Sequence, residues 1–135
     1  MTYFESVADR AEHPVDIVER LASMNEWSFE RDEDDEISIV VAGRWTDYTV
    51  AFTWLEDIEA LHISCAFDLK LTERRRAAAA ELATLVNEHL WIGHFDLWPG
   101  ENVAMFRHAM LLAGGIGPSG RQCATMLQAA IDACE

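Results

Sequence analysis

The side chains best suited to bind a metal ion or a small polar ligand lie in two stretches of alternating polarity. His62 belongs to the first stretch, while His94 and Asp96 share one face of the second. Imidazole and carboxylate groups are common ligands of zinc and iron, so these residues, with His108 as a further ligand, could form a site on an outer sheet face. Such a site needs three or four ligands converging at about 2 Å, and ordinary solvent-facing positions are the simpler interpretation.

Two other motifs match known binding loops in part. Gly115, Gly117 and Gly120 fit the spacing GxGxxG, but no strand is predicted after them, as a dinucleotide site requires. The acidic run from Asp32 to Glu36 begins like a calcium loop, yet it lacks the glycine and the final glutamate that such a loop needs. We therefore predict a turn before a helix at the glycines, and a solvated hairpin tip at the acidic run.

The three cysteines could supply nucleophiles. Cys65, Cys123 and Cys134 fall on apolar faces of their segments, without the CxxC spacing of a zinc or redox site. We expect them to be small core residues with reduced thiols, as in a cytoplasmic protein. No catalytic residue and no cofactor is predicted, so the chain is expected not to be an enzyme.

A third group of residues suggests contact with another protein. Arg74 and the two arginines after it occupy the first turn of a predicted helix, where the helix dipole disfavours positive charge. Pairing with the chain's own carboxylates is one explanation, and contact with an acidic partner is the other. Two tryptophans have no predicted inward position, and exposed tryptophan favours interfaces. The predicted partner-binding residues are Trp45, Arg74, Arg75, Arg76, His94, Asp96 and Trp98.

The overall charge restricts the classes of partner. The 135 residues include 24 Asp and Glu but only 10 Lys and Arg, which gives a net charge of -14. This charge repels nucleic acid and anionic membranes, and no stretch has the roughly 20 apolar residues of a membrane span. The first twelve residues lack the pattern of a signal peptide. We therefore expect a cytoplasmic protein that binds neither nucleic acid nor membrane.

Hydrophobic periodicity predicts the elements that position these residues. The order is α-β-β-β-β-α-β-β-α, an α+β fold with helices packed on an antiparallel sheet. Residues 1–12 are predicted to be a flexible N-terminal segment, and 13–135 a single domain. The segment 103–112 alone is ambiguous between strand and helix. The predicted helices are 14–25, 73–93 and one after Ser119, and the clear strands are 27–31, 37–41, 48–54, 61–67 and 95–97.

Five segments together resemble the YbjN-domain family over His13 to Cys134, nearly the whole chain. They are HPVDIVER, NEWSFERDEDDE, GRWTDYTVAFTWLEDIEALHISCAFDLK, RRAAAAELATLVNEHLWIGHFDLW and MFRHAMLLAGGIG. The resemblance implies a fold like that of type III secretion chaperones, usually dimeric, in which 103–112 is a strand. It also implies a regulator of sensory transduction with no established catalytic residues or cofactor.

The combined expectation is a non-enzymatic protein-binding module, chaperone-like or regulatory, that forms a homodimer and binds a protein of unknown identity. Strand addition or docking of a helix in a groove would both suit such a domain. The alternative is a small-molecule or metal-binding domain that uses the outer sheet face through His62, His94 and Asp96.

Overall fold

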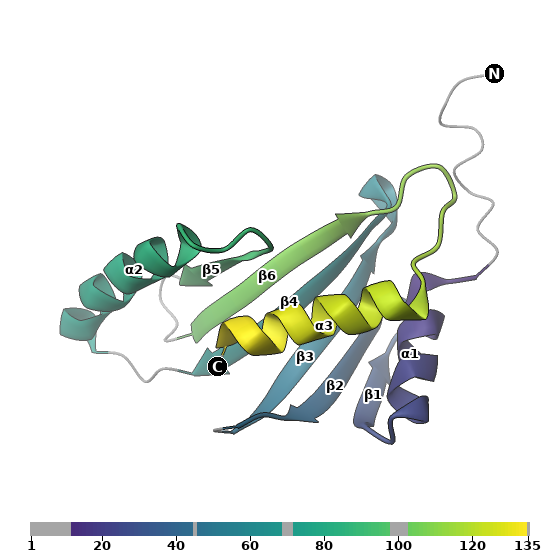
Figure 1. The fold of residues 1–135 in the computed structure, drawn as a ribbon, viewed down its shortest axis with the longest axis horizontal. Helices are drawn as coiled ribbons and strands as arrows, with labels where there is room; N and C mark the ends of the chain where they lie inside the picture. The colour runs from purple at the N-terminus through teal and green to yellow at the C-terminus, as the bar shows by residue number, and fades with distance from the viewer. Residues whose placement is uncertain (1–11, 45, 69–71, 98–102, 135) are drawn as a thin grey trace.

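The computed structural model describes residues 12–44, 46–68, 72–97 and 103–134. Within these residues, six strands form one antiparallel sheet in the order β1-β2-β3-β4-β6-β5 (Figure 1). Strand β6 thus lies between β4 and the short edge strand β5. The strands are β1 (Ser28–Asp32), β2 (Glu36–Ala42), β3 (Asp47–Leu55), β4 (Ala60–Asp68), β5 (His94–Leu97) and β6 (Val103–Leu111).

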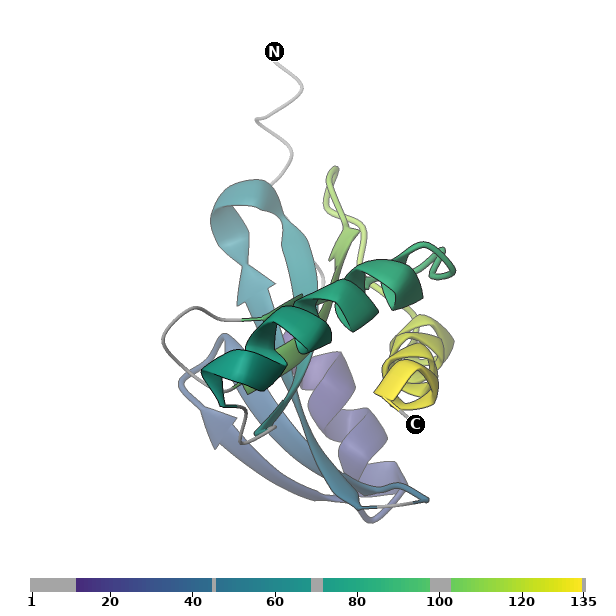
Figure 2. The same cartoon turned by 90° about the vertical axis from the view of Figure 1, so that its left-hand side faces the viewer.

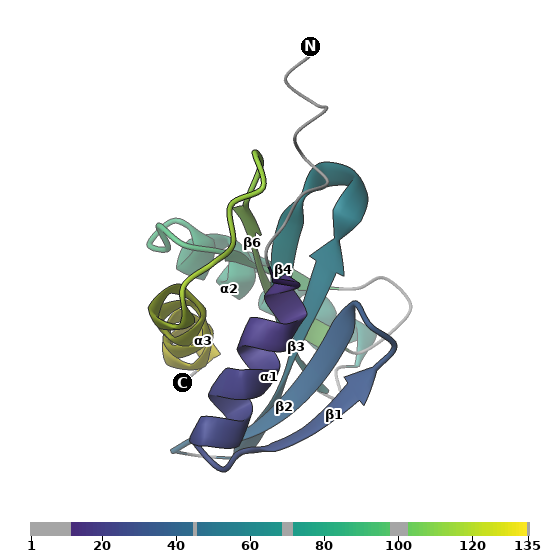
Figure 3. The same cartoon turned by 90° about the vertical axis from the view of Figure 1, so that its right-hand side faces the viewer.

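The α-helices of the described residues lie on the same side of this sheet (Figure 3). They are α1 (Pro14–Met24), α2 (Glu73–Asn87) and α3 (Gly120–Cys134), and a short 3-10 helix, η1 (Glu56–Ile58), joins β3 to β4. No described helix combines the length and the apolar character that crossing a membrane requires. Among the described residues, no helix lies on the opposite face of the sheet.

The core forms because apolar side chains alternate along the central strands and therefore point to one face. The register places Val50 of β3 opposite Cys65 of β4, and Cys65 opposite Phe106 of β6, and all three side chains are buried. Helices α1 and α3 pack against each other and cover this face, α1 over β1 to β3 and α3 over β4 and β6.

Both covering helices begin at a side-chain cap. The His13 Nδ1 atom accepts a hydrogen bond of 3.0 Å from the Val15 amide at the start of α1. At the start of α3, the Ser119 hydroxyl accepts from the Gln122 amide at 3.0 Å, and the Gln122 side chain accepts from the Ser119 amide at 2.8 Å. This reciprocal pair is the capping box, which satisfies amides that have no partner inside the helix.

Helix α2 is attached differently, since it packs mainly on the edge strand β5. Its last residue, Asn87, makes two hydrogen bonds with Phe95 of β5: the Phe95 amide donates to Asn87 Oδ1 at 2.8 Å, and Asn87 Nδ2 donates to the Phe95 carbonyl at 3.1 Å. Much of the helix surface is exposed, including Leu82 and Leu85. The two hydrogen bonds between Asn87 and Phe95 therefore help to position α2, in addition to its apolar packing.

The predicted α+β class and the order of elements are confirmed, and 103–111 is a strand, as the family resemblance implied. One boundary was wrong: α2 ends at Asn87, before the predicted stop at Gly93, because the chain turns there to reach β5. The 3-10 helix η1 was not predicted. Of the segment predicted to be flexible, only Glu12 is described, where it pairs with Arg20 of α1.

Gly93 and Gly114 provide a test of how tightly the α2–β5 turn is packed. Both have positive φ, +73° and +90°, but a Cβ at Gly93 would lie 2.3 Å from Phe106 Cζ and 2.8 Å from the Arg107 carbonyl oxygen, whereas nothing lies within 4 Å at Gly114. We expect Gly114→Ala to cost about 1–2 kcal/mol of unfolding free energy from backbone strain alone. Gly93→Ala should cost about 2 kcal/mol more because of overpacking. Urea unfolding measures both, and equal losses would contradict this account.

Candidate functional site

The register of β4, β6 and β5 gathers a polar cluster on the helix-free face of the sheet. Ser64 pairs with Arg107, and Arg107 pairs with His94, so all three lie in one row across the sheet. Arg107 Nε donates to His62 Nε2 at 3.2 Å, and its Nη1 lies 3.3 Å from Asp96 Oδ2. The His94 ring is 3.3 Å from the same Asp96 oxygen. The outer-face residues predicted to lie together therefore do so, with Arg107 between them.

Arg107 changes what this cluster can do. A guanidinium carries a permanent positive charge and only donates hydrogen bonds, so it occupies the lone pairs that a metal ion would use. Among the described residues, no group of three or more His, Cys, Asp and Glu side chains is placed to hold a metal ion. The cluster is a set of polar groups that satisfy one another, and sequence reasoning missed its central member.

His108 was expected to add to the same site, and this prediction was wrong. It pairs with Ile63, whose side chain is in the core, so His108 lies on the helix-covered face. A residue's face depends on its parity along the strand, and His108 follows Arg107 by one residue. The His108 side chain lines a hollow beside α3 instead.

The electrostatics of the cluster favour a neutral His62. Burial lowers its pKa below the usual 6.5, and the positive charge of Arg107 lowers it further. The pKa of His108 is also lowered, first by burial and then by the charge of His94. A neutral imidazole at His62 can accept the hydrogen bond that Arg107 donates.

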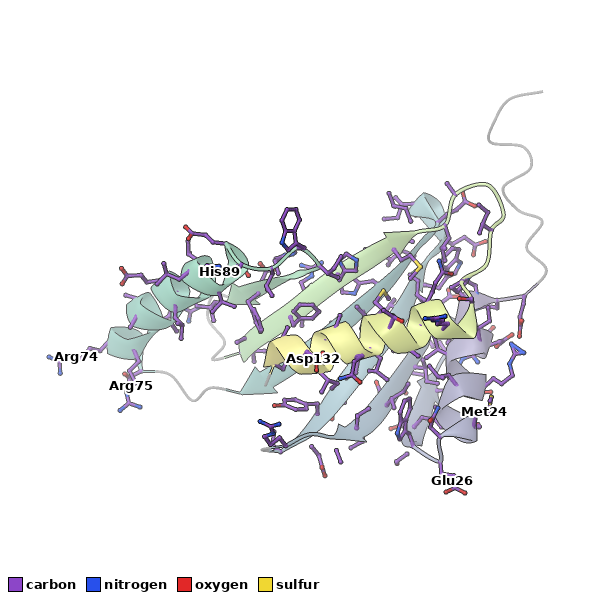
Figure 4. The ribbon with its side chains drawn as sticks, viewed as in Figure 1. Met24, Glu26, Arg74, Arg75, His89 and Asp132 are labelled. Carbon is purple, nitrogen blue, oxygen red and sulfur yellow. The ribbon has the colours of Figure 1, made fainter. Side chains whose placement is uncertain are left out.

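The described residues among those predicted to contact a partner lie in different parts of the fold. Arg74 and Arg75 are exposed and point away from the sheet at the start of α2 (Figure 4). His94 and Asp96 lie on the helix-free face of β5. Trp45 and Trp98 lie outside the described residues.

Two hollows lie along α3. The first, of about 370 Å³, lies between α3 and β6, and its lining combines apolar side chains such as Ile92, Met110 and Met126 with polar ones such as Gln122, Thr125 and Arg121. The second, of about 210 Å³, lies between α2, β5 and the last turn of α3. Ala129 lines the first and Ala133 the second, and these residues are one helical turn apart on one face of α3.

We call the two hollows together the α2–α3 groove, of which the second hollow reaches α2. Figure 2 shows α2 and α3 as neighbouring helices. Leu82 and Val86 form its α2 wall, Ala129 and Ala133 its α3 wall, and Ala104 and His108 its floor on β6. Leu82 is 61% exposed and Ile92, at the rim, 48%. Trp91, adjacent in sequence to Ile92, is 98% exposed. Exposed apolar surface of this kind is typical of sites that bind a partner.

The sequence contained part of this signal. The apolar positions of α2, Leu82 and Val86 among them, do share one helix face, as the spacing predicted. Periodicity shows which residues lie together and not what covers them, so the partial exposure of this face could not be predicted. The predicted partner-binding tryptophans were Trp45 and Trp98, and Trp91 was not among them.

The lowered pKa of His62 predicts a pH dependence of stability. In the folded state the pKa of His62 is below the unfolded value near 6.5. Below pH 6.5 the unfolded chain therefore binds a proton at His62 more readily than the folded chain does. Stability conferred by a neutral His62 is therefore present above pH 6.5 and is lost as the pH falls. We expect His62→Gln, which keeps an acceptor for Arg107, to lose less stability than the wild type between pH 7.5 and 5.5. Urea unfolding at each pH and an NMR titration of the His62 ring test this. Identical pH profiles would contradict it.

Both the sequence and the fold of this chain are similar to those of a known protein family. The family model YbjN, described as "Putative bacterial sensory transduction regulator", matches residues 14–135. The fold is similar to that in "Crystal structure of YbjN, a putative transcription regulator from E. coli", with a TM-score of 0.61 over 89% of this chain and 84% of that chain. At 9% identity this likeness concerns the fold alone, and no curated protein matches the chain. Because the family model spans nearly the whole sequence, the chain belongs to the YbjN family.

Proposed function

We propose that this chain is a non-enzymatic regulatory module that binds a segment of another protein in the α2–α3 groove. The observation that carries the proposal is the groove itself, an apolar surface between two helices that share few contacts. The description of the family as a regulator supports the non-enzymatic part. The polar cluster on the other face supports it as well, since its groups are engaged with one another.

The groove favours one kind of occupant. Its lining extends from Ser119, the residue before α3, to Ala133, 14 positions along the chain, which corresponds to about 21 Å at 1.5 Å per residue. An amphipathic helix of about four turns fits this length, with apolar side chains at i, i+3, i+4 and i+7 facing the groove. Strand addition is less suited, because the neighbouring edge strand β5 is only four residues long.

The charge of the chain indicates which side chains the partner segment carries on its solvent-facing side. The chain carries a net charge of -14, and the exposed Asp132 lies on α3 next to Ala133 of the groove wall (Figure 4). A segment with Lys and Arg on its solvent-facing side would be attracted by the net negative charge of the chain, although Arg121 lines the first hollow, and would associate faster at low salt. We therefore propose a basic amphipathic helix as the partner segment, bound in a reducing cytoplasm.

Leu82 and Leu85 form a matched pair that tests this function. Both are exposed leucines of α2, 61% and 53%, but only Leu82 lines the groove. The probe is a labelled 16-residue amphipathic peptide of Leu and Lys, measured by fluorescence anisotropy. We expect Leu82→Asp to weaken binding about tenfold or more and Leu85→Asp less than about threefold, because only Leu82 lines the groove. Both substitutions add the same charge to the same helix, so the added charge cannot explain a difference between them.

A control peptide and a measurement of the oligomeric state test the proposed occupant further. A Leu/Glu peptide of the same pattern should not bind. Equal effects of the two substitutions would mean that the peptide does not bind in the groove. Homodimer formation stays a prediction, which sedimentation velocity measures on the same variants. A wild-type dimer that Leu82→Asp dissociates would assign the groove to a second copy of the chain and overturn the proposed occupant.

A further inference from the structure

Two of the three cysteines meet inside the fold although 69 positions separate them in sequence. Cys65 lies on the inner face of β4 and is fully buried in the core. Cys134 is the last residue of α3, is partly exposed, and packs against the same core. The two thiols lie within hydrogen-bonding reach of each other, and this contact lowers the pKa of Cys65 against the opposing effect of burial.

The last turn of α3 is held in this position by a second strand. The Tyr48 hydroxyl of β3 donates to the Cys134 carbonyl oxygen at 3.3 Å. Helix α3 also packs on β4, the strand that carries Cys65. The two sulfurs are therefore kept close by the packing of the fold.

Cys123 has a different environment. It lies on α3 eleven residues before Cys134, about 16 Å along the helix, and is fully buried. Burial raises its pKa to about 11, so its thiolate is scarce at neutral pH. It provides an internal comparison for any reaction of the other two.

We propose that Cys65 and Cys134 form an oxidative modification site, at which a hydroperoxide converts the two thiols into one intramolecular disulfide. This site goes beyond the proposed function and does not depend on it. The geometry assigns different roles to the two residues. Cys134 is the sulfur that an oxidant can reach, and Cys65 is the buried sulfur that resolves the first product.

The chemistry takes two steps. The Cys134 thiolate attacks one oxygen of the hydroperoxide, the O–O bond breaks, and sulfenic acid forms while hydroxide or alkoxide leaves and takes up a proton. The Cys65 thiolate then attacks the sulfenic sulfur, an S–S bond forms, and the S–O bond breaks to release hydroxide, which takes up the proton lost by the Cys65 thiol and becomes water. Each sulfur loses one electron, and the hydroperoxide gains two.

The bond would connect the end of α3 to the middle of the sheet. It would close a loop of about 70 residues, which restricts the unfolded chain and raises the temperature of unfolding. Ala133 of the groove wall precedes Cys134, so the same bond would fix that wall.

The experiment uses the full chain in native buffer with hydrogen peroxide as the oxidant. Intact mass should fall by about 2 Da, and peptide mapping without reductant should find Cys65 joined to Cys134. Alkylation of the unfolded chain should then label Cys123 alone. The oxidised protein should unfold several degrees higher than the reduced protein, and reductant should reverse the change.

Two variants complete the test. Cys123→Ala should still lose about 2 Da, whereas Cys134→Ser should not, although it keeps a small polar side chain at the same place. Peroxide-treated protein in urea should give mixed pairings, which shows that the native fold selects the pair. The proposal is overturned if the native chain retains three thiols, if the bond includes Cys123, or if it joins two chains.

Discussion

The structure depends on the burial of one face of an antiparallel sheet. Because successive side chains of a strand point to opposite faces, the apolar residues of β3, β4 and β6 form one continuous surface that water disfavours. Helices α1 and α3 cover that surface over β1 to β4 and part of β6. What remains over β6 and β5 is left to α2, which covers it incompletely, and the α2–α3 groove results from this mismatch between six strands and the helices above them.

The position of α2 follows from the same constraint. Since its apolar face is only partly covered, α2 is placed by polar and steric contacts at its C-terminal end. Asn87 bonds both backbone groups of Phe95, and Gly93 permits the close approach of the turn to Phe106. These contacts fix one end of the helix while leaving Leu82 and Leu85 at the surface. A helix held in this way can flank a groove without filling it.

The elements could be predicted from the sequence because each has a local pattern, whereas the sites depend on pairing between distant strands. The alternation of β3 and β4 and the capping box at Ser119 are visible within a few residues. The placement of β6 between β4 and β5 is not, and it decides the two findings about the polar residues that differed from expectation. It inserts Arg107 between His62 and Asp96, and it turns His108 to the covered face.

The cysteines show how a correct assignment to the core can still miss chemistry. Cys65 and Cys134 were expected on apolar faces, and both pack in the core, as residues with small apolar side chains do. The interpretation of each as inert treated them one at a time. A core, however, collects residues from distant parts of the chain, so two thiols that are each unremarkable become reactive partners once α3 lies across β4. The burial that explains their residue type therefore also brings the two sulfurs into contact.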